Sequence, residues 1–210
     1  MDLSNKVVVT CAITGVLTNP ERFNVPVTPG ERAEATRKAF DQGASIVHAH
    51  FISQQPGMEM WPTWDTKEVG DILTAIRHRV PKMIINMSTG VMGANISGPM
   101  ACLEKFKPEM AACNAGSLNY LKIRKDGQWA WPPILFDNPV EKVKQFTDIM
   151  AANNIVPEFE CFDTGIVRSV GMFKENGMFS GNPHLSFVMG VDSGMPARAW
   201  RRMLPSATSR

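Results

Sequence analysis

The feature that most constrains this chain is a regular alternation of short apolar runs with longer amphipathic segments. The runs are largely apolar on both faces, which is typical of parallel strands covered by helices on both sides. We expect six strands, over residues 7–13, 45–50, 83–87, 109–113, 156–162 and 185–191.

Helix start signals lie between these runs. Thr28, Asp65 and Asn138 can each cap a helix, and a Glu follows each of them three residues later. Such a cap satisfies backbone N–H groups that have no partner within the helix. The sequence therefore predicts helices over residues 29–42, 66–79 and 139–153, with further helices near 99–106 and 164–176. The segment that holds Trp129 and Trp131 is expected to be a long loop after the fourth strand.

Repeated strand–helix–strand units predict right-handed crossovers and a parallel sheet, either a doubly wound open sheet or a barrel. The chain has neither a G-x-G-x-x-G run after its first strand nor a phosphate-binding G-x-x-x-x-G-K-[ST] motif. This favours an α/β fold of the (β/α)8 TIM-barrel type, with about six βα units present and the last two strands missing. We expect residues 1–196 to form an incomplete catalytic barrel domain. Residues 197–210, rich in Arg, Ala, Pro and Ser, are expected to be an unstructured or non-native tail.

Composition narrows the functional classes. Hydrophobic residues make up 44% of the chain, charged residues 20%, and the formal net charge is +2. This balance does not favour a nucleic-acid or membrane partner. The four cysteines contain no C-x-x-C pair and are expected to be reduced thiols, as in a cytoplasmic protein.

The strongest local signal is His48-Ala49-His50 at the end of the second predicted strand. Side chains alternate across a strand, so both imidazoles should point to the same side. Two neutral imidazoles at such a strand end suit a cation such as Zn²⁺. The same pair also fits a polar rim in which both rings are satisfied by hydrogen bonds.

Polar residues also follow the next two strands. Ser88, Thr89 and Gly90 could bind an anionic substrate through hydroxyl donors and close backbone approach, or could form an ordinary βα turn. Asn114, at the end of the fourth strand, could bind a carbonyl or carboxylate group, or stabilise a turn.

Two acids share one face of the fifth strand. Glu158 and Glu160 are two residues apart in an apolar run, and burying a carboxylate is costly unless it is paired or lies near a metal. Either one could act as an acid or base or orient a ligand. The alternative is a structural ion pair with a neighbouring Lys or Arg.

Taken in order, the motifs resemble one family. The chain is similar to the β-keto acid cleavage enzymes, typified by 3-keto-5-aminohexanoate cleavage enzyme, from about residue 6 to residue 196. The stretches that carry the resemblance are residues 11–15 (CAITG), 25–29 (VPVTP), 43–50 (GASIVHAH), 88–90 (STG), 108–111 (PEMA), 157–160 (PEFE) and 187–191 (FVMGV).

The resemblance implies a barrel with a catalytic Zn²⁺ in its mouth and a reaction of a β-keto acid with acetyl-CoA that gives acetoacetate and an acyl-CoA. It implies His48 and His50 as metal ligands and Ser88 as a substrate-binding residue, next to the substrate-binding candidates Thr89 and Gly90. Glu160 and Asn114 are the catalytic candidates. The implied partners are small molecules and, in a homo-oligomer, further copies of the chain.

Some positions depart from the family pattern. The aminohexanoate enzyme has a Glu just after its first T-G, whereas Thr14-Gly15 is followed by Val16 here, so we expect a neutral or apolar β-keto acid. Ala112 stands at the place of a substrate-binding threonine. In the family, the third metal ligand is a Glu in a G-x-E-D segment that this sequence does not contain, so we expect weak metal binding and impaired activity.

Two other hypotheses remain open at this point. The chain could be a catalytically silent truncated barrel that acts only through subunit association, because uncovered strand edges favour association. It could also be another metal-dependent barrel lyase or aldolase, which would not require acetyl-CoA.

Overall fold

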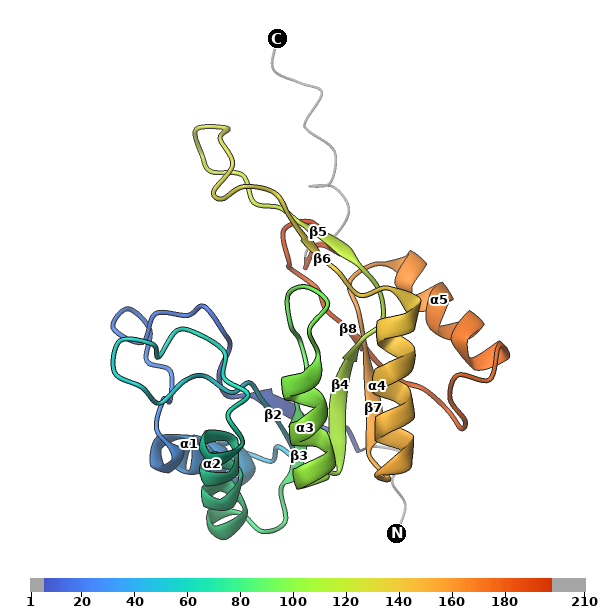
Figure 1. Ribbon diagram of the computed structural model, residues 1–210. Helices are drawn as coiled ribbons and strands as arrows, with labels where there is room; N and C mark the ends of the chain where they lie inside the picture. The colour runs from blue at the N-terminus through green and yellow to red at the C-terminus, as the bar shows by residue number, and fades with distance from the viewer. Residues whose placement is uncertain (1–5, 198–210) are drawn as a thin grey trace. The chain divides into compact units, whose positions relative to one another are not determined.

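The computed structural model describes residues 6–197, in which parallel strands alternate with helices (Figure 1). Six strands are hydrogen-bonded in the order β1-β2-β3-β4-β7-β8. The pairs β1–β2, β2–β3, β3–β4 and β7–β8 are parallel. These strands are β1 (Thr10–Ala12), β2 (Ile46–Ala49), β3 (Ile84–Met87), β4 (Met110–Asn114), β7 (Val156–Cys161) and β8 (His184–Phe187).

One helix follows each of the first three strands, and two more follow later in the chain. They are α1 (Pro29–Asp41), α2 (Thr66–Arg79), α3 (Ser97–Phe106), α4 (Val140–Ala152) and α5 (Thr164–Glu175). A parallel sheet whose strand order follows the chain, with a helix in each crossover, is the pattern of a (β/α)8 barrel. The predicted fold class is confirmed, and every predicted strand and helix lies within a few residues of an observed one.

The chain divides into two compact units. Among the described residues, unit 1 comprises residues 6–89, 96–112 and 149–156, and unit 2 comprises residues 90–95, 113–148 and 157–197. The prediction that residues 1–196 form one catalytic domain stays a prediction. The tail predicted over residues 197–210 lies, apart from its first residue, outside the described residues.

Unit 1 has a core built from strands β2 and β3 and the inner faces of α2 and α3. All four residues of β2 are buried, as expected for a strand covered on both faces. The fully buried side chains of this core include Val47, Val69, Ile72, Ile76, Ile85, Met87 and Leu103.

Two helices of unit 1 begin as the sequence predicts. Thr28 and Glu31 form a complete capping box at the start of α1. The carboxylate of Asp65 accepts hydrogen bonds from the backbone N–H groups of Lys67 and Glu68 at the start of α2. The predicted cap at Asn138 stays a prediction, and the side-chain amide of this residue donates to the carbonyl oxygen of Gly116.

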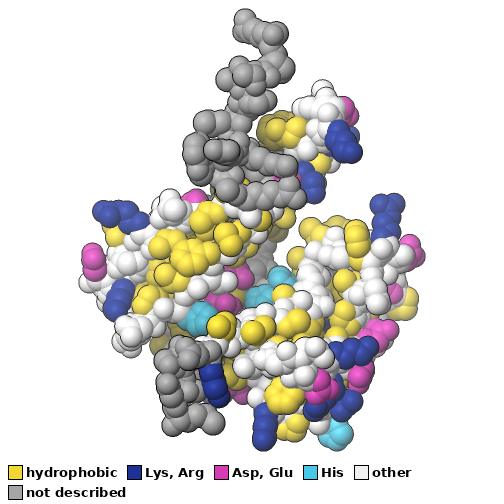
Figure 2. Space-filling model, turned by 180° about the vertical axis from the view of Figure 1, so that it is seen from behind, with side chains coloured by type: hydrophobic (Ala, Val, Ile, Leu, Met, Phe, Trp, Pro, Cys, Tyr) yellow, Lys and Arg dark blue, Asp and Glu magenta, His cyan; other side chains and the backbone are white. Residues whose placement is uncertain are grey.

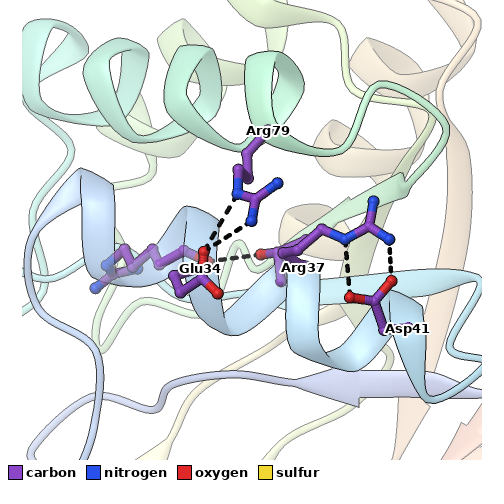
Figure 3. A network of polar contacts seen from close by, with 6 residues as sticks. Glu34, Arg37, Asp41 and Arg79 are labelled. Atoms are coloured by element: carbon purple, nitrogen blue, oxygen red, sulfur yellow. Dashed lines mark hydrogen bonds and ion pairs between the residues drawn. The ribbon is translucent and has the colours of Figure 1, made fainter.

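Helices α1 and α2 lie side by side and are joined by charged side chains at their exposed surface (Figure 3). Arg79 near the end of α2 pairs with Glu34 of α1 at 3.2 Å. Arg37 pairs with Asp41 one turn further along α1. Exposed pairs of this kind contribute at most about 1 kcal/mol each, so apolar burial is the main source of stability at this contact.

Unit 2 contains an antiparallel hairpin where the sequence predicted a long loop. Strands β5 (Leu118–Tyr120) and β6 (Ile134–Phe136) pair, and the segment between them extends as an arm (Figure 1). Within the arm, the rings of Tyr120 and Trp131 are stacked with their centres 5.7 Å apart. Lys122 lies over the Trp131 ring at 5.6 Å. Contacts of this kind order a hairpin whose strands are only three residues long.

The molecular surface carries hydrophobic patches among Lys, Arg, Asp and Glu side chains on the face that Figure 2 shows. Several exposed apolar residues belong to the β5–β6 hairpin and its arm, among them Ile123, Trp129, Ile134 and Leu135. Within residues 6–197, no helix combines the length and the apolar character needed to cross a bilayer.

Candidate functional site

The two histidines converge at the end of strand β2. His48 lies within the sheet, in register with Ala12 of β1 and Asn86 of β3, whereas His50 comes just after the last paired residue. Their Nε2 atoms are 3.2 Å apart, and their ring centres are 5.0 Å apart. The rings therefore lie on the same side of the strand, as the alternation of side chains predicts.

Electrostatics keep His50 neutral. Burial lowers the pKa of His50 to about 3, and the nearby charges of His48 and Arg32 act in the same direction. A neutral imidazole has a lone pair available for a metal ion or for a hydrogen bond. At this distance, an Nε2–H group on one ring can donate a hydrogen bond to the Nε2 atom of the other.

The spacing of the two rings fits a tetrahedral ion. Imidazole nitrogens bind Zn²⁺ at about 2.0–2.1 Å, which places two tetrahedral ligands roughly 3.3 Å apart. The observed separation of 3.2 Å is close to this value. In the part of the chain that the structure describes, no group of three or more His, Cys, Asp or Glu side chains could hold a metal ion. The pair could therefore supply two of the three protein ligands that are usual for a catalytic zinc.

Ser88 and Thr89 follow strand β3 directly and are both buried. The backbone N–H of Ser88 donates to the carbonyl oxygen of Ala49 at 3.0 Å, which extends the pairing of β2 and β3 by one step. The Thr89 hydroxyl donates to the carbonyl oxygen of Ala112 at 2.6 Å. Thr89 thus has a structural hydrogen bond, and of the two hydroxyls that of Ser88 is the better candidate for a substrate contact.

Gly90 and Asn114 lie close together in unit 2. A Cβ atom added at Gly90 would lie 3.4 Å from the Asn114 amide nitrogen, which is van der Waals contact. Asn114 is the last residue of β4 and is buried. The structure therefore brings together two residues that the sequence selected separately.

The loop after Gly90 is held by Lys142, in the first turn of α4. Its ammonium donates to the carbonyl oxygens of Val91, Gly93 and Asp137 at 3.0, 3.1 and 2.8 Å. An ammonium has three N–H groups, so these three acceptors use all of them. The side chain is buried, and burial lowers the pKa of its ammonium.

Glu158 and Glu160 lie on strand β7 in different surroundings. Glu158 is buried and pairs with His184 of β8 at 3.6 Å, directly across the strand register. The partner is thus a histidine instead of the Lys or Arg considered from the sequence. Burial raises the pKa of Glu160 to about 7, and the charge of Glu158 adds to this effect. A carboxyl group of this kind can both accept and release a proton near neutral pH.

Two buried cations were not identified from the sequence, one that contacts His50 and one that contacts the loop after Gly90. Arg32 is completely buried in the first turn of α1, and Lys142 is 5% exposed. Both lie on the apolar faces of predicted helices, Arg32 one turn before Thr36 and Lys142 one turn before Phe146. A charge on the core-facing side of an amphipathic helix was the available signal.

The fold and the residues described above indicate the class of protein. Polar and ionisable side chains at the carboxyl ends of parallel strands, in a βα barrel pattern, are the arrangement of a barrel enzyme. The sequence profile of the β-keto acid cleavage enzymes matches residues 6–208. The chain belongs to this family.

Individual relatives agree with the family. The chain is 30% identical to 3-oxoadipate:acetyl-CoA acetyltransferase of Cupriavidus necator, over 96% of this chain and 69% of the relative. It is also 30% identical to 3-keto-5-aminohexanoate cleavage enzyme of Fusobacterium nucleatum, over 93% of this chain and 67% of the relative. The chain therefore spans about two thirds of the length of these curated relatives.

Solved structures support the fold. A ternary complex of ObcA with a C4-CoA adduct and oxalate superimposes with a TM-score of 0.61 at 21% sequence identity. The match covers 80% of this chain and 38% of the ObcA chain.

Replacing Lys142 should loosen the loop that follows Gly90. We expect Lys142→Met to lower the free energy of unfolding by about 2–4 kcal/mol, because three charge-assisted hydrogen bonds are lost at once. Lys144→Met is the matched control, since Lys144 on the same helix makes an exposed pair with Asp148 and should change stability by less than about 1 kcal/mol. Urea denaturation of both variants measures the difference, and equal midpoints would contradict the assigned role of Lys142.

Glu160 should make stability depend on pH. Its pKa in the folded protein, about 7, lies above the ordinary value of 4.5, so the folded state binds this proton more tightly than the unfolded chain does. The resulting stabilisation is present below about pH 4.5 and is lost as the pH rises through 7.

We therefore expect Glu160→Gln to be more stable than the parent protein at pH 8, by up to about 3 kcal/mol, and to lose this advantage near pH 4. Glu175→Gln, at the exposed end of α5, is the control. Thermal unfolding across this pH range measures the effect. A constant difference between parent and Glu160→Gln would show that the Glu160 carboxyl does not titrate as described.

Proposed function

We propose that this protein transfers an acetyl group from acetyl-CoA to the carboxymethyl portion of a β-keto acid, so that acetoacetate and an acyl-CoA are formed. The bond between the β-carbonyl carbon and C2 of the keto acid breaks, and a new bond joins C2 to the carbonyl carbon of the acetyl group. The CoA sulfur loses its bond to the acetyl group and forms a new thioester bond to the acyl group of the keto acid. Family membership and the converging pair His48 and His50 support this proposal.

His48 and His50 would hold a divalent ion, with Zn²⁺ the best match to two imidazoles at this spacing. When bound, such an ion polarises a carbonyl oxygen and stabilises the negative charge that develops on it. The two histidines would present their lone pairs on one side of β2, and burial lowers the pKa of His50, so this ring is neutral at physiological pH.

The segment Ser88-Thr89-Gly90 would bind the carboxylate of the keto acid. The Ser88 hydroxyl can donate to a carboxylate oxygen, and the missing side chain at Gly90 leaves the backbone accessible. Asn114, next to Gly90, would orient a carbonyl group through its amide N–H. Val16 and Leu17 follow Thr14-Gly15, so a neutral or apolar acyl group fits this part of the chain better than a cationic one.

Glu160 would move the proton. The protons at C2 of a β-keto acid are acidic because two carbonyl-type groups flank that carbon. A carboxylate with a pKa of about 7 is a stronger base than an ordinary one and is still ionised in a large fraction of molecules at neutral pH. Glu158 lies 3.6 Å from His184, and this contact supports a structural role for the second acid.

Isotope labelling tests the reaction directly. Acetyl-CoA labelled in its carbonyl carbon should deliver the label to the keto carbon of acetoacetate when it is incubated with the protein, Zn²⁺ and a short unbranched β-keto acid. Carbon NMR of the product locates the label. Carbon–carbon cleavage that proceeds without acetyl-CoA would assign the chain to a different metal-dependent lyase instead.

Variants in the same assay connect the reaction to the histidines. We expect His48→Ala and His50→Ala each to reduce kcat/KM by a factor of about 100 or more, while His78→Ala, near the end of α2, leaves it unchanged.

A second candidate function is subunit association. The β5–β6 hairpin and its arm expose Ile123, Trp129, Ile134 and Leu135, an amount of apolar surface that suits a protein contact. In this case we expect oligomers in analytical ultracentrifugation, and a double variant with Trp129→Ser and Leu135→Ser should shift them toward monomers. A parent protein that sediments as a monomer at about 100 μM, a concentration at which most specific interfaces are populated, would rule this function out.

A further inference from the structure

Arg32 is the most deeply buried charged side chain among the described residues, with 0% of its surface exposed. It belongs to the first turn of α1, yet its side chain reaches the end of strand β2. Its Nε donates to the carbonyl oxygen of Val27 at 3.0 Å, and its Nη1 donates to the carbonyl oxygen of His50. Its Nη2 has no hydrogen-bond partner within the described part of the chain.

The surroundings of Arg32 are not those of a structural ion pair. Glu31 is the acid whose charge acts on Arg32. Its carboxylate, however, accepts hydrogen bonds from the backbone N–H groups of Val27 and Thr28 at the start of α1. The bonds of the guanidinium go to backbone carbonyls instead. Burying a cation in this way is costly, because the guanidinium loses its hydration and gains no hydrogen bond to a carboxylate among the described residues in return. The arrangement therefore points to a role for the two carbonyls that Arg32 holds.

The two histidines differ in how their backbone is fixed. His48 is paired with strands on both sides, through Ala12 and Asn86. The pairing of β2 with β3 ends at Ala49, so His50 lies beyond the ladder. The next anchor along the chain is the hydrogen bond from Thr63 to the carbonyl oxygen of Phe51. Between these two fixed points, it is the carbonyl oxygen of His50 that Arg32 holds.

We propose that Arg32 is a positioning residue for the metal site: it fixes the backbone of His50 against the start of α1 and so holds the His50 ring at chelating distance from His48. This inference rests on the proposed function, because it presupposes that the two imidazoles bind a divalent ion. Val27, the other carbonyl partner, also accepts a hydrogen bond from the Gln54 amide, so the start of α1 is itself tied to the segment after His50.

The test compares metal affinity with stability. Arg32→Met keeps most of the buried volume and removes all hydrogen bonds of the guanidinium, and Arg32→Lys keeps a cation but loses the forked geometry. Arg37→Met is the matched control, because Arg37 lies on the same helix and makes a surface pair with Asp41. Isothermal calorimetry with Zn²⁺ and the absorption spectrum of bound Co²⁺ measure the site, and thermal unfolding of the metal-free proteins measures the fold.

We expect Arg32→Met to weaken Zn²⁺ binding by a factor of about 10–100 and to alter the Co²⁺ spectrum, as when a residue that orients a metal ligand is lost. Arg32→Lys should lie between this variant and the parent protein, and Arg37→Met should match the parent. A folded Arg32→Met that binds Zn²⁺ as tightly as the parent overturns the inference and leaves the proposed function intact.

Two further outcomes are decisive. If Arg32→Met does not fold, a folded Arg32→Lys decides: weakened binding supports the inference, and unchanged binding overturns it. If the parent protein binds neither Zn²⁺ nor Co²⁺, the metal site of the proposed function fails and the inference fails with it.

Discussion

The parallel pairing of β2 with its two neighbours is the constraint on which the candidate site depends. Backbone hydrogen bonds on both sides hold His48 in register with Ala12 and Asn86. Because side chains alternate along a strand, this register also decides that the His50 ring returns to the side of the His48 ring. The short distance between the imidazoles thus follows from the sheet. His50 lies just beyond the β2–β3 ladder, where the hydrogen bond from Arg32 to its carbonyl oxygen holds the backbone.

Charged groups are used in two opposite ways around the candidate residues. The buried cations Arg32 and Lys142 bind backbone carbonyl oxygens and keep segments of chain in place. The acid Glu160 lies near another acid and is partly deprived of water, so its proton affinity rises.

Much of the fold could be predicted because its signals are local. Apolar runs placed the six parallel strands, and capping residues such as Thr28 and Asp65 placed the helix starts to within a residue or two. The alternation along β2 was enough to predict that the two histidines face the same side. The hairpin β5–β6 was missed because its strands are only three residues long and carry little alternation.

Other features depend on contacts between distant parts of the chain, which no local pattern contains. The partner of Glu158 is His184 because β7 and β8 pair in a register that the sequence does not display. The reach of Arg32 to His50 depends on how α1 lies against β2, and the reach of Lys142 depends on how two loops of unit 2 meet.

The contacts of Lys142 have a consequence for how far the loop after Gly90 can vary in sequence. The ammonium holds Val91 and Gly93 through their main-chain oxygens, which every amino acid possesses. Lys142 therefore fixes the course of this loop through the main chain alone, although Gly93 itself has a φ of 79°, which favours glycine. Positions of the loop other than Gly93 can change their side chains while these hydrogen bonds stay in place, so one buried lysine separates the course of the loop from most of its sequence.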